Sequence, residues 1–214
     1  MFRTTIAAAL LIVGTGLAHA GAILSPVSVT GNTLGTFGGS TANIINQSGI
    51  PAFASGVTDF DTYMAGSPTH AVFGGSNAWS SVEDVVTGDL DFDLGGLFQI
   101  GKVALWNQAA ASQDINGFTI LTADNAGFIG ATDVGSFNAS DANRIGQVFD
   151  IADSIGRYVR LRITSNHGSA RFTTLGEFAV DVSDAPPPVP LPASLPLLGG
   201  ALVAAAGLRR LRRR

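Results

Sequence analysis

The chain has 214 residues, of which 46% are hydrophobic and 13% are charged, and it contains 27 glycines and no cysteine. Once the two ends are set aside, this length allows one domain of ordinary size. The glycine-rich and weakly charged composition favours a β-rich secreted domain over a helical one. The lack of cysteine excludes a disulfide framework, a thiolate metal site and a cysteine nucleophile.

The net charge of −4 is unevenly distributed along the chain. All acidic residues lie between Asp59 and Asp184, whereas five arginines lie within the last six residues. Without its ends the domain therefore carries ten more acidic than basic side chains. We do not expect nucleic acid as a partner, because a phosphate backbone is bound through a basic face. A cation is a better candidate.

Residues 1–20 have the pattern of a secretory signal peptide. Arg3 gives the positive start, residues 6–17 the apolar core, and Ala18-His19-Ala20 a small-residue cleavage site. A transmembrane anchor is the alternative, but the apolar run is short for a bilayer span. The sequence therefore predicts a mature chain that begins near Gly21.

The first part of the predicted domain, residues 22–56, is rich in Gly, Ser, Thr and Asn. We expect one early strand near Ala22–Thr30 and otherwise loop. The following segment, Val57–Tyr63, is expected to be a loop that carries Asp59 and Asp61. Carboxylates two residues apart can converge on a hard cation, although such a pair is also common in solvated turns.

Residues 65–81 again read as a loop, with His70, Asn77 and Trp79 as its chemically interesting members. Ligand-binding loops on a rigid sheet often combine an aromatic ring that stacks on a sugar with amide and imidazole groups. The alternative, which we favour for Trp79, is that its side chain closes one end of the core.

The central part of the chain contains two strand-like runs. Leu90–Leu94 alternates apolar and acidic residues, which is the period of a half-buried strand. Gly95-Gly96 follows, and Ile100–Trp106 is a second apolar run, so we expect these two runs to pair across a short antiparallel turn. Asp91 and Asp93 are the obvious carboxylate pair for glycoside hydrolysis, but solvation on a polar strand face explains them.

The remaining strands are predicted by alternation of apolar and polar residues. They are Phe118–Thr122, a strand around Phe137, Gln147–Ile151, Arg157–Ile163 and Glu177–Val182. The basic face of Arg157–Ile163 is either solvated or paired with neighbouring acids. Short strands separated by turn residues, without a long helix, indicate an all-β fold, a two-sheet antiparallel sandwich.

A family resemblance covers roughly residues 50–182. The segments LDFDLG, KVALWN, FTILTADN, IGRYVRLRI and LGEFAV, in this order, resemble the discoidin or factor five/eight type C family. The resemblance implies an eight-stranded jelly roll, also called galactose-binding-like. It also implies a structural Ca²⁺ ion held by Asp59, Asp61 and Glu177. The match is incomplete, because Phe60 stands where the family has glycine and a later threonine is displaced.

The C-terminal end has the order of a sorting signal. A proline-rich linker begins at Ala185, and residues 194–208 form an apolar run that barely reaches the length of a bilayer span and precedes the arginine cluster. The motif itself is Val189, Pro190, Leu191, Pro192 and Ala193. This order resembles the VPLPA-CTERM variant of the bacterial PEP-CTERM signal.

That resemblance implies a role for the C-terminal end in delivery rather than in the fold. An exosortase-type peptidase in the inner membrane would recognise the segment, cut near the motif and send the protein to the surface of a Gram-negative cell or release it. A C-terminal anchor that stays attached is the alternative. The expected organisation is a signal peptide (1–20), a β-sandwich domain (21–184), a linker with the sorting motif (185–193) and an apolar sorting helix with arginines (194–214).

The sequence gives no indication of catalysis, because it has no G-x-S-x-G motif, no recognisable Ser-His-Asp arrangement and no histidine pair with metal-ligand spacing. We therefore predict a secreted, surface-sorted, non-catalytic module that binds carbohydrate or exopolysaccharide. A passive matrix protein is the alternative, and a glycoside-active enzyme is less favoured. In the binding interpretation, loops at one end of the domain hold a glycan through His70, Asn77, Trp79, Asn107, His167 and Arg171.

Overall fold

A computed structural model describes residues 21–141 and 144–184, so the predicted signal peptide, sorting motif and apolar tail lie outside the described residues. The strands are β1 Ala22–Leu24, β2 Ser28–Asn32, β3 Gly38–Gly39, β4 Trp79–Ser80, β5 Gly88–Trp106, β6 Gly117–Ala123, β7 Thr132–Asn138, β8 Gln147–Ile163, β9 Thr174–Leu175 and β10 Glu177–Asp184. One α-helix, α1 Phe60–Ala65, and two 3-10 turns, η1 Thr41–Ile44 and η2 Ala111–Gln113, complete the described elements.

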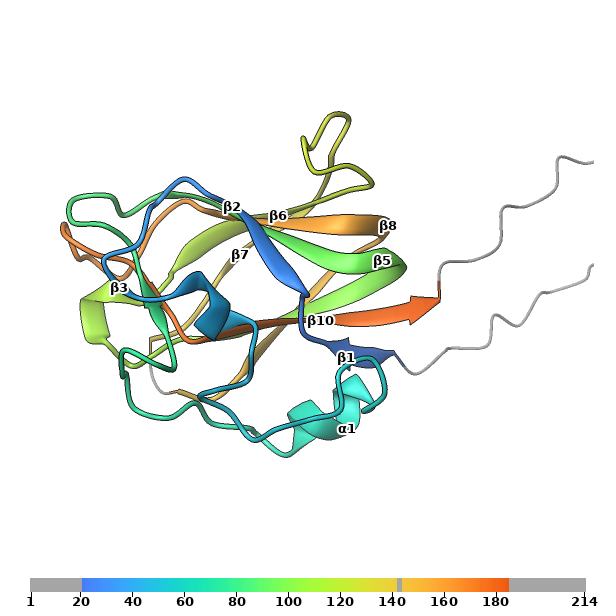
Figure 1. Ribbon diagram of the computed structural model, residues 1–214, viewed down its shortest axis with the longest axis horizontal. Coiled ribbons are helices and arrows are strands. Elements are labelled where there is room, and N and C mark those ends of the chain that lie inside the picture. Colours follow the sequence, from blue (N-terminus) through green and yellow to red (C-terminus); the bar gives the residue numbers. More distant parts are fainter. Residues whose placement is uncertain (1–20, 142–143, 185–214) are drawn as a thin grey trace, which may run out of the picture. The chain divides into compact units, whose positions relative to one another are not determined.

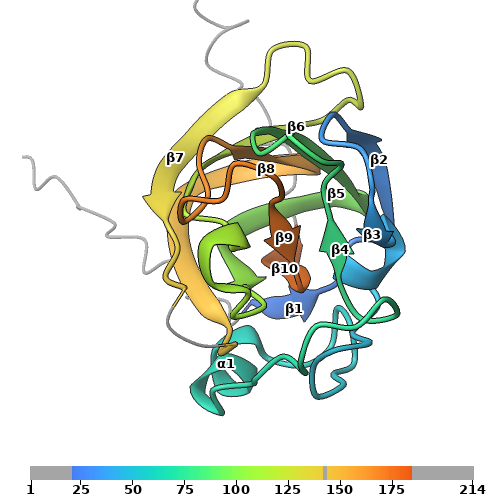
Figure 2. The same ribbon diagram turned by 90° about the vertical axis from the view of Figure 1, so that its left-hand side faces the viewer.

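The strands form two antiparallel sheets (Figure 1). The larger sheet has the order β1-β10-β5-β8-β6-β7, and β2 also pairs with β5. The smaller sheet has the order β3-β4-β9 and lies at one end of the domain, where it faces the viewer in Figure 2. The predicted all-β, two-sheet antiparallel sandwich is confirmed.

Strand β5 corrects one prediction. The runs Leu90–Leu94 and Ile100–Trp106 do not pair with each other, because they are successive halves of one strand and both pair with β8. The register with β8 shifts after Asp93, and Gly95 has a φ of +81°, a backbone conformation that glycine adopts without strain. The two glycines therefore bend the strand as a bulge does instead of reversing its direction.

The other predicted strands are present with changed limits. Phe118–Thr122 lies in β6, the strand around Phe137 is β7, and Glu177–Val182 lies in β10. The two runs predicted at Gln147–Ile151 and Arg157–Ile163 are one continuous strand, β8. The early strand predicted at Ala22–Thr30 is interrupted between β1 and β2, where the chain contains Pro26 and proline cannot donate a ladder hydrogen bond.

The main core lies on the inner face of β5. Phe92 and Phe178 stack with their ring centroids 4.4 Å apart, and Trp79 is fully buried in the same cluster. The Trp79 indole donates to Gly35 O at 3.1 Å and to the Thr36 hydroxyl at 2.9 Å, which satisfies its one polar atom. The interpretation of Trp79 as the side chain that closes the core is therefore confirmed.

A second, smaller core lies beneath α1. Its buried members are Ile23, Ile50, Phe60, Ala104, Trp106 and Ala179. The segment Val57–Tyr63, predicted to be a loop, contains the start of α1, and Asp59 caps that helix by accepting a hydrogen bond from Thr62 N at 2.7 Å. The helix covers the face of β5 and β10 that the main core leaves open.

The outer face of β5 and β8 carries a ladder of ion pairs, Asp89–Arg162, Asp91–Arg160 and Asp93–Arg157. Arg160 donates from Nε to Asp91 Oδ1 at 2.6 Å and from Nη2 to Oδ2 at 2.8 Å, and its guanidinium lies 4.2 Å from the centre of the Phe128 ring. The hydrogen bond from Arg157 lowers the pKa of Asp93 below its ordinary value. The sequence suggested that Asp91 and Asp93 are solvated. The structure shows instead that both are paired with arginines and only 8% exposed.

Removal of Arg160 should destabilise the domain by about 2 kcal/mol. An Arg160→Ala variant leaves the Asp91 carboxylate poorly solvated and without its bidentate partner, although the Arg160 side chain is 21% exposed and the cost stays below that of a fully buried pair. The matched control is Arg162→Ala, because Arg162 is 44% exposed and its loss should cost less than about 1 kcal/mol. Urea unfolding measures both, and equal losses would contradict the prediction.

Candidate functional site

Three loops meet at the end of the domain that carries the small sheet. They are residues 33–37 before β3, residues 81–86 after β4 and residues 165–173 before β9. A fourth loop, residues 71–78, leads into β4. Backbone hydrogen bonds join them, from Val82 N to Leu34 O at 3.0 Å and from Asp84 N to Arg171 O at 2.8 Å. Asn77, His167 and Arg171 lie in these loops. His70 comes just before the fourth loop, Trp79 lies in β4, and Asn107 follows β5.

Three of the six predicted ligand residues are buried and cannot reach a glycan. Trp79 and Asn107 are 0% exposed, and His70 is 1% exposed, with its Nδ1 2.8 Å from Ala71 O and 2.9 Å from Gln108 Nε2. Burial lowers the pKa of His70, which favours the neutral imidazole. The prediction that these three side chains contact a ligand is wrong, because each one completes the interior.

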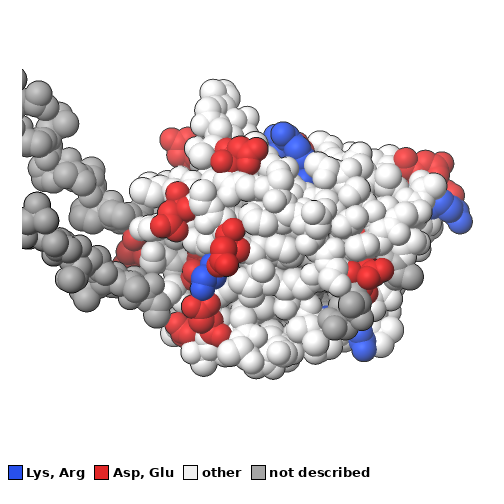
Figure 3. Space-filling model, turned by 180° about the vertical axis from the view of Figure 1, so that it is seen from behind, with Lys and Arg blue, Asp and Glu red and all other residues white. Residues whose placement is uncertain are grey.

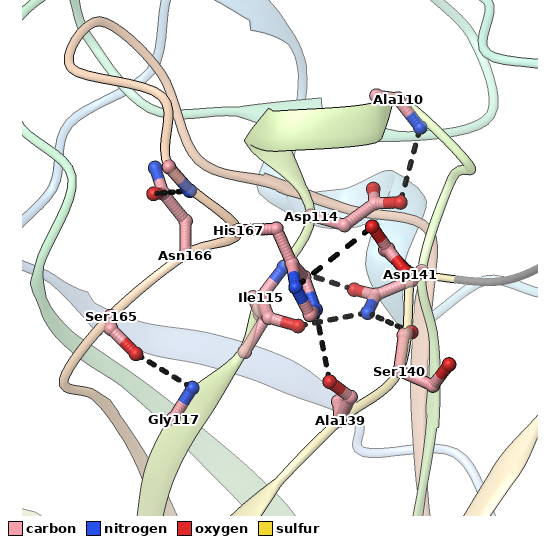
Figure 4. A network of polar contacts seen from close by, with 12 residues as sticks. Ala110, Asp114, Ile115, Gly117, Ala139, Ser140, Asp141, Ser165, Asn166 and His167 are labelled. Carbon is pink, nitrogen blue, oxygen red and sulfur yellow. Dashed lines mark hydrogen bonds and ion pairs between the residues drawn. The ribbon is translucent and has the colours of Figure 1, made fainter.

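Asn107 and His167 bond to backbone groups of neighbouring segments instead, and Figure 4 shows His167 beside Ala139. The Asn107 amide donates to Ile115 O and to Ser140 O, both at 2.9 Å, and accepts from Ile115 N at 3.1 Å. His167 Nε2 lies 2.9 Å from Ala139 O. Asn107 therefore connects the loop after β5 to the segment that follows β7, and His167 connects the β8–β9 loop to the same segment.

Asp114, also shown in Figure 4, completes this network of buried polar groups. Its carboxylate accepts from Gln108 N, Ala110 N and the Thr174 hydroxyl at 3.0 to 3.2 Å. Burial nevertheless raises the pKa of Asp114 above its ordinary value, since the cost of desolvation exceeds the effect of these hydrogen bonds. The network gives the loops a fixed shape, but its groups bind one another.

The other two predicted ligand residues lie nearer the surface. Asn77 is partly buried and stabilises its own loop, with Oδ1 accepting from Gly74 N at 2.7 Å and Nδ2 donating to Val72 O at 2.9 Å. Arg171 is exposed and forms an ion pair with Glu83, and its guanidinium lies 5.2 Å from the centre of the Phe172 ring.

Phe172 lies beside Arg171 and contacts Phe37, and Phe73 lies next to Gly38; we call these three phenylalanines the aromatic patch. Phe37 is 70% exposed, and its ring centroid is 5.1 Å from that of Phe172 at an interplanar angle of 31°. Phe73 is 42% exposed, and its ring edge is 3.8 Å from the position that a Cβ on Gly38 would occupy.

The small sheet brings Phe37 and Phe172 together. Gly38 and Thr174 both pair with Ser80, so the segments just before β3 and β9 leave the sheet at the same end. We did not predict these phenylalanines. The signal in the sequence is the repeated motif Phe-Gly-Gly at residues 37–39 and 73–75, which places an aromatic ring inside loops of small residues.

The three predicted calcium ligands do not form one site. Asp59 caps α1, and Asp61 pairs with Lys102, which stands opposite Asp181 in the sheet. Glu177 lies four residues away on β10, opposite Trp106. In residues 21–141 and 144–184 no three side chains of His, Cys, Asp or Glu gather into a group that could hold a metal ion.

Glu177 by itself does have a property that suits a cation. It is 0% exposed, Oε2 accepts from Gln47 N at 3.0 Å, and Oε1 has no hydrogen-bond partner among the described residues. Burial raises the pKa of Glu177 to about 9. A buried carboxylate oxygen without a partner fits a bound cation, whereas Asp59 and Asp61 already have other partners.

Residues 92–181 match the Sad1/UNC-like C-terminal family model. That domain has a discoidin or galactose-binding-like fold, in agreement with the resemblance found in the sequence. The sequence has no significant match among curated proteins.

Three solved carbohydrate-binding modules are similar in structure. Chitosan-binding module 1 of a chitosanase/glucanase from Paenibacillus sp. IK-5 gives a TM-score of 0.48 at 19% identity, covering 73% of this chain and 95% of that one. A family 32 module of Clostridium perfringens NanJ in complex with galactose gives 0.40 at 14% identity, covering 48% and 74%. The CBM32 of AlyQ in complex with 4,5-unsaturated mannuronic acid gives 0.40 at 22% identity, covering 48% and 75%. At these scores the similarity assigns no ligand to this chain.

No helix within the described ranges is both long and apolar enough to cross a membrane.

Proposed function

We propose that residues 21–184 form a non-catalytic carbohydrate-binding module whose ligand lies against the aromatic patch. The observation that carries this proposal is the 70% exposure of Phe37 next to Phe172. When a flat ligand covers an exposed aromatic ring, the apolar surface of the ring is removed from water, which favours binding. A sugar ring offers such a face through its C–H bonds, and Arg171 and Glu83 at the edge of the patch can hydrogen-bond hydroxyl groups.

A passive matrix role is the second candidate function, and in that role binding would not depend on Phe37. A protein that acts only through bulk association with exopolysaccharide has no need for three phenylalanines gathered from separate loops. The two functions therefore differ in whether one surface dominates binding.

A Phe37→Ala substitution tests the proposal. On a glycan array and then by titration with the best ligand, we expect affinity to fall at least about tenfold, or about 1.4 kcal/mol. Stability should change by less than about 0.5 kcal/mol, because the ring is exposed. The matched control is Ile129→Ala, since Ile129 is 83% exposed on the β6–β7 hairpin. Loss of binding in both variants, or in neither, would reject the aromatic patch, and an array without any signal would favour the matrix role.

Calcium forms a second part of the proposed function. Glu177 would contribute Oε1 to a Ca²⁺ ion that fixes the loop of residues 46–50, which already contacts this carboxylate through Gln47 N. Bound calcium would be the positively charged partner that the buried Glu177 carboxylate lacks. Millimolar Ca²⁺ should then raise the melting temperature of the natural chain and leave that of Glu177→Gln unchanged. An unchanged melting temperature of the natural chain in Ca²⁺ would reject the proposed calcium site.

Export and sorting complete the proposal. Residues 1–20 direct the chain across the inner membrane, and residues 189–193 are the recognition motif for an exosortase-type peptidase, which delivers the domain to the surface or the extracellular matrix. The basis is the order of motif, apolar run and arginine cluster in the sequence. Mass spectrometry of the mature protein tests it, because an intact Arg214 would show that no processing occurs.

A further inference from the structure

We infer that the aromatic patch selects glycans that carry positively charged amino groups over glycans that carry carboxylates. This inference rests on the proposed function and names the ligand class of the same site. It follows from the charged groups around the patch and from the charge of the whole domain.

The edge of the patch carries more negative than positive charge. Arg171 is the cation beside Phe172, and its guanidinium is already paired with the Glu83 carboxylate. The next residue, Asp84, is exposed, and its backbone N–H donates to Arg171 O at 2.8 Å, which places the backbone of Asp84 next to that of Arg171. No contact within the described part of the chain uses the Asp84 carboxylate, so one negative charge at the edge is uncompensated.

The rest of the domain strengthens this preference. Between residues 21 and 184 the sequence has sixteen acidic and six basic side chains, and acidic groups outnumber basic ones on the face that Figure 3 shows. Five of the six basic side chains form ion pairs with carboxylates, namely Lys102, Arg157, Arg160, Arg162 and Arg171. A polyanion would therefore meet a repulsive surface, whereas an ammonium group on a sugar would be attracted by the net negative charge of Glu83, Asp84 and Arg171 together.

Chitosan and chitin provide matched probes, because they share one backbone and differ in the acetylation of the amino group. Oligomannuronate is the anionic probe. With the full chain at low salt, we expect at least fivefold tighter binding to a glucosamine hexasaccharide than to its N-acetylated form, and the weakest binding to the oligomannuronate. The preference should shrink at high salt, since screening weakens exposed charge interactions.

The substitution Asp84→Asn separates the local from the global charge. Asp84 has a φ of +64°, a conformation that asparagine also tolerates, so the loop should keep its shape. We expect the variant to lose most of the preference for the amino form. Asp124→Asn, on the β6–β7 hairpin, removes the same charge from an exposed position and should keep the preference.

The outcomes distinguish this inference from the proposed function. Equal affinity for the two hexasaccharides, tighter binding to the oligomannuronate, or equal effects of Asp84→Asn and Asp124→Asn would overturn the inference. If Phe37→Ala still abolished binding in those cases, the proposed function would stand. A chain that binds none of the probes and no glycan on the array would overturn both.

Discussion

Replacement of Glu177 by glutamine should remove most of a pH dependence of stability that the natural chain shows in the absence of metal. The pKa of this carboxyl rises from 4.5 to about 9 on folding, because burial disfavours the charged form and the one hydrogen bond that it receives, from Gln47 N, only partly offsets this effect. Between these values the folded protein keeps a proton that the unfolded chain releases. The contribution of Glu177 to stability is therefore fully present below about pH 4.5 and is lost as pH rises toward 9.

The size of the effect follows from proton linkage. One proton gives a slope of about 1.4 kcal/mol per pH unit, so the natural chain should lose about 3 kcal/mol relative to Glu177→Gln between pH 5 and pH 7. Other groups with shifted pKa values, such as His70 and Asp114, are present in both proteins and cancel in the difference.

Urea unfolding in EDTA at several pH values measures this difference. Glu83→Gln is the matched control, because Glu83 is the only other glutamate in the sequence and its side chain is 49% exposed. Its stability curve should run parallel to that of the natural chain. Parallel curves for Glu177→Gln as well would show that the carboxyl is solvated in the folded protein.

An alanine at Gly176 should destabilise the domain by about 3 kcal/mol, at the upper end of the cost of overpacking. A Cβ at this position would lie 2.0 Å from Gln108 Nε2, 2.8 Å from His70 Cδ2 and 2.9 Å from Trp106 O. The last contact is with backbone, which cannot move aside by a rotamer change. Thermal unfolding should show a decrease of roughly 6–12 °C for a chain of this size.

Two further variants make this result interpretable. Gly75→Ala is the control, because a Cβ there would have nothing within 4 Å and Gly75 lies in an exposed loop. Gly176→Ala combined with Gln108→Ala should recover part of the loss, since the shortest contact disappears and the two changes are not additive. A Gly176→Ala protein as stable as Gly75→Ala would contradict the packing described for this region.

Regular alternation made much of the fold predictable. The segments Phe118–Thr122, Arg157–Ile163 and Glu177–Val182 each place alternate apolar residues in the main core, and all three lie in strands. The continuity of β5 was not predictable from its own residues. Gly95-Gly96 is compatible with a tight turn, and only the distant partner β8, which pairs with both halves, holds the strand extended.

The candidate site was less predictable, because burial depends on residues far away in the sequence. His70 and Asn107 have the chemistry of ligand-binding groups, yet His70 Nδ1 faces Gln108 and the Asn107 amide faces Ile115 and Ser140. Asp59 has the chemistry of a calcium ligand, but Thr62 three residues later gives it a helix to cap. Conversely, Phe37 has the apolar side chain of a core residue, yet it is 70% exposed.

The pairing of β1 with β10 has a consequence for the proposed export. Ala22 stands opposite Val182, so the first strand of the domain waits for a partner that is made about 160 residues later. Until that last segment has left the ribosome, the large sheet is missing one of its edges and its second core stays incomplete, because Ile23 and Ala179 both belong to that core. A chain threaded across a membrane from its N-terminus can therefore remain unfolded during passage and close into its final shape only on the far side.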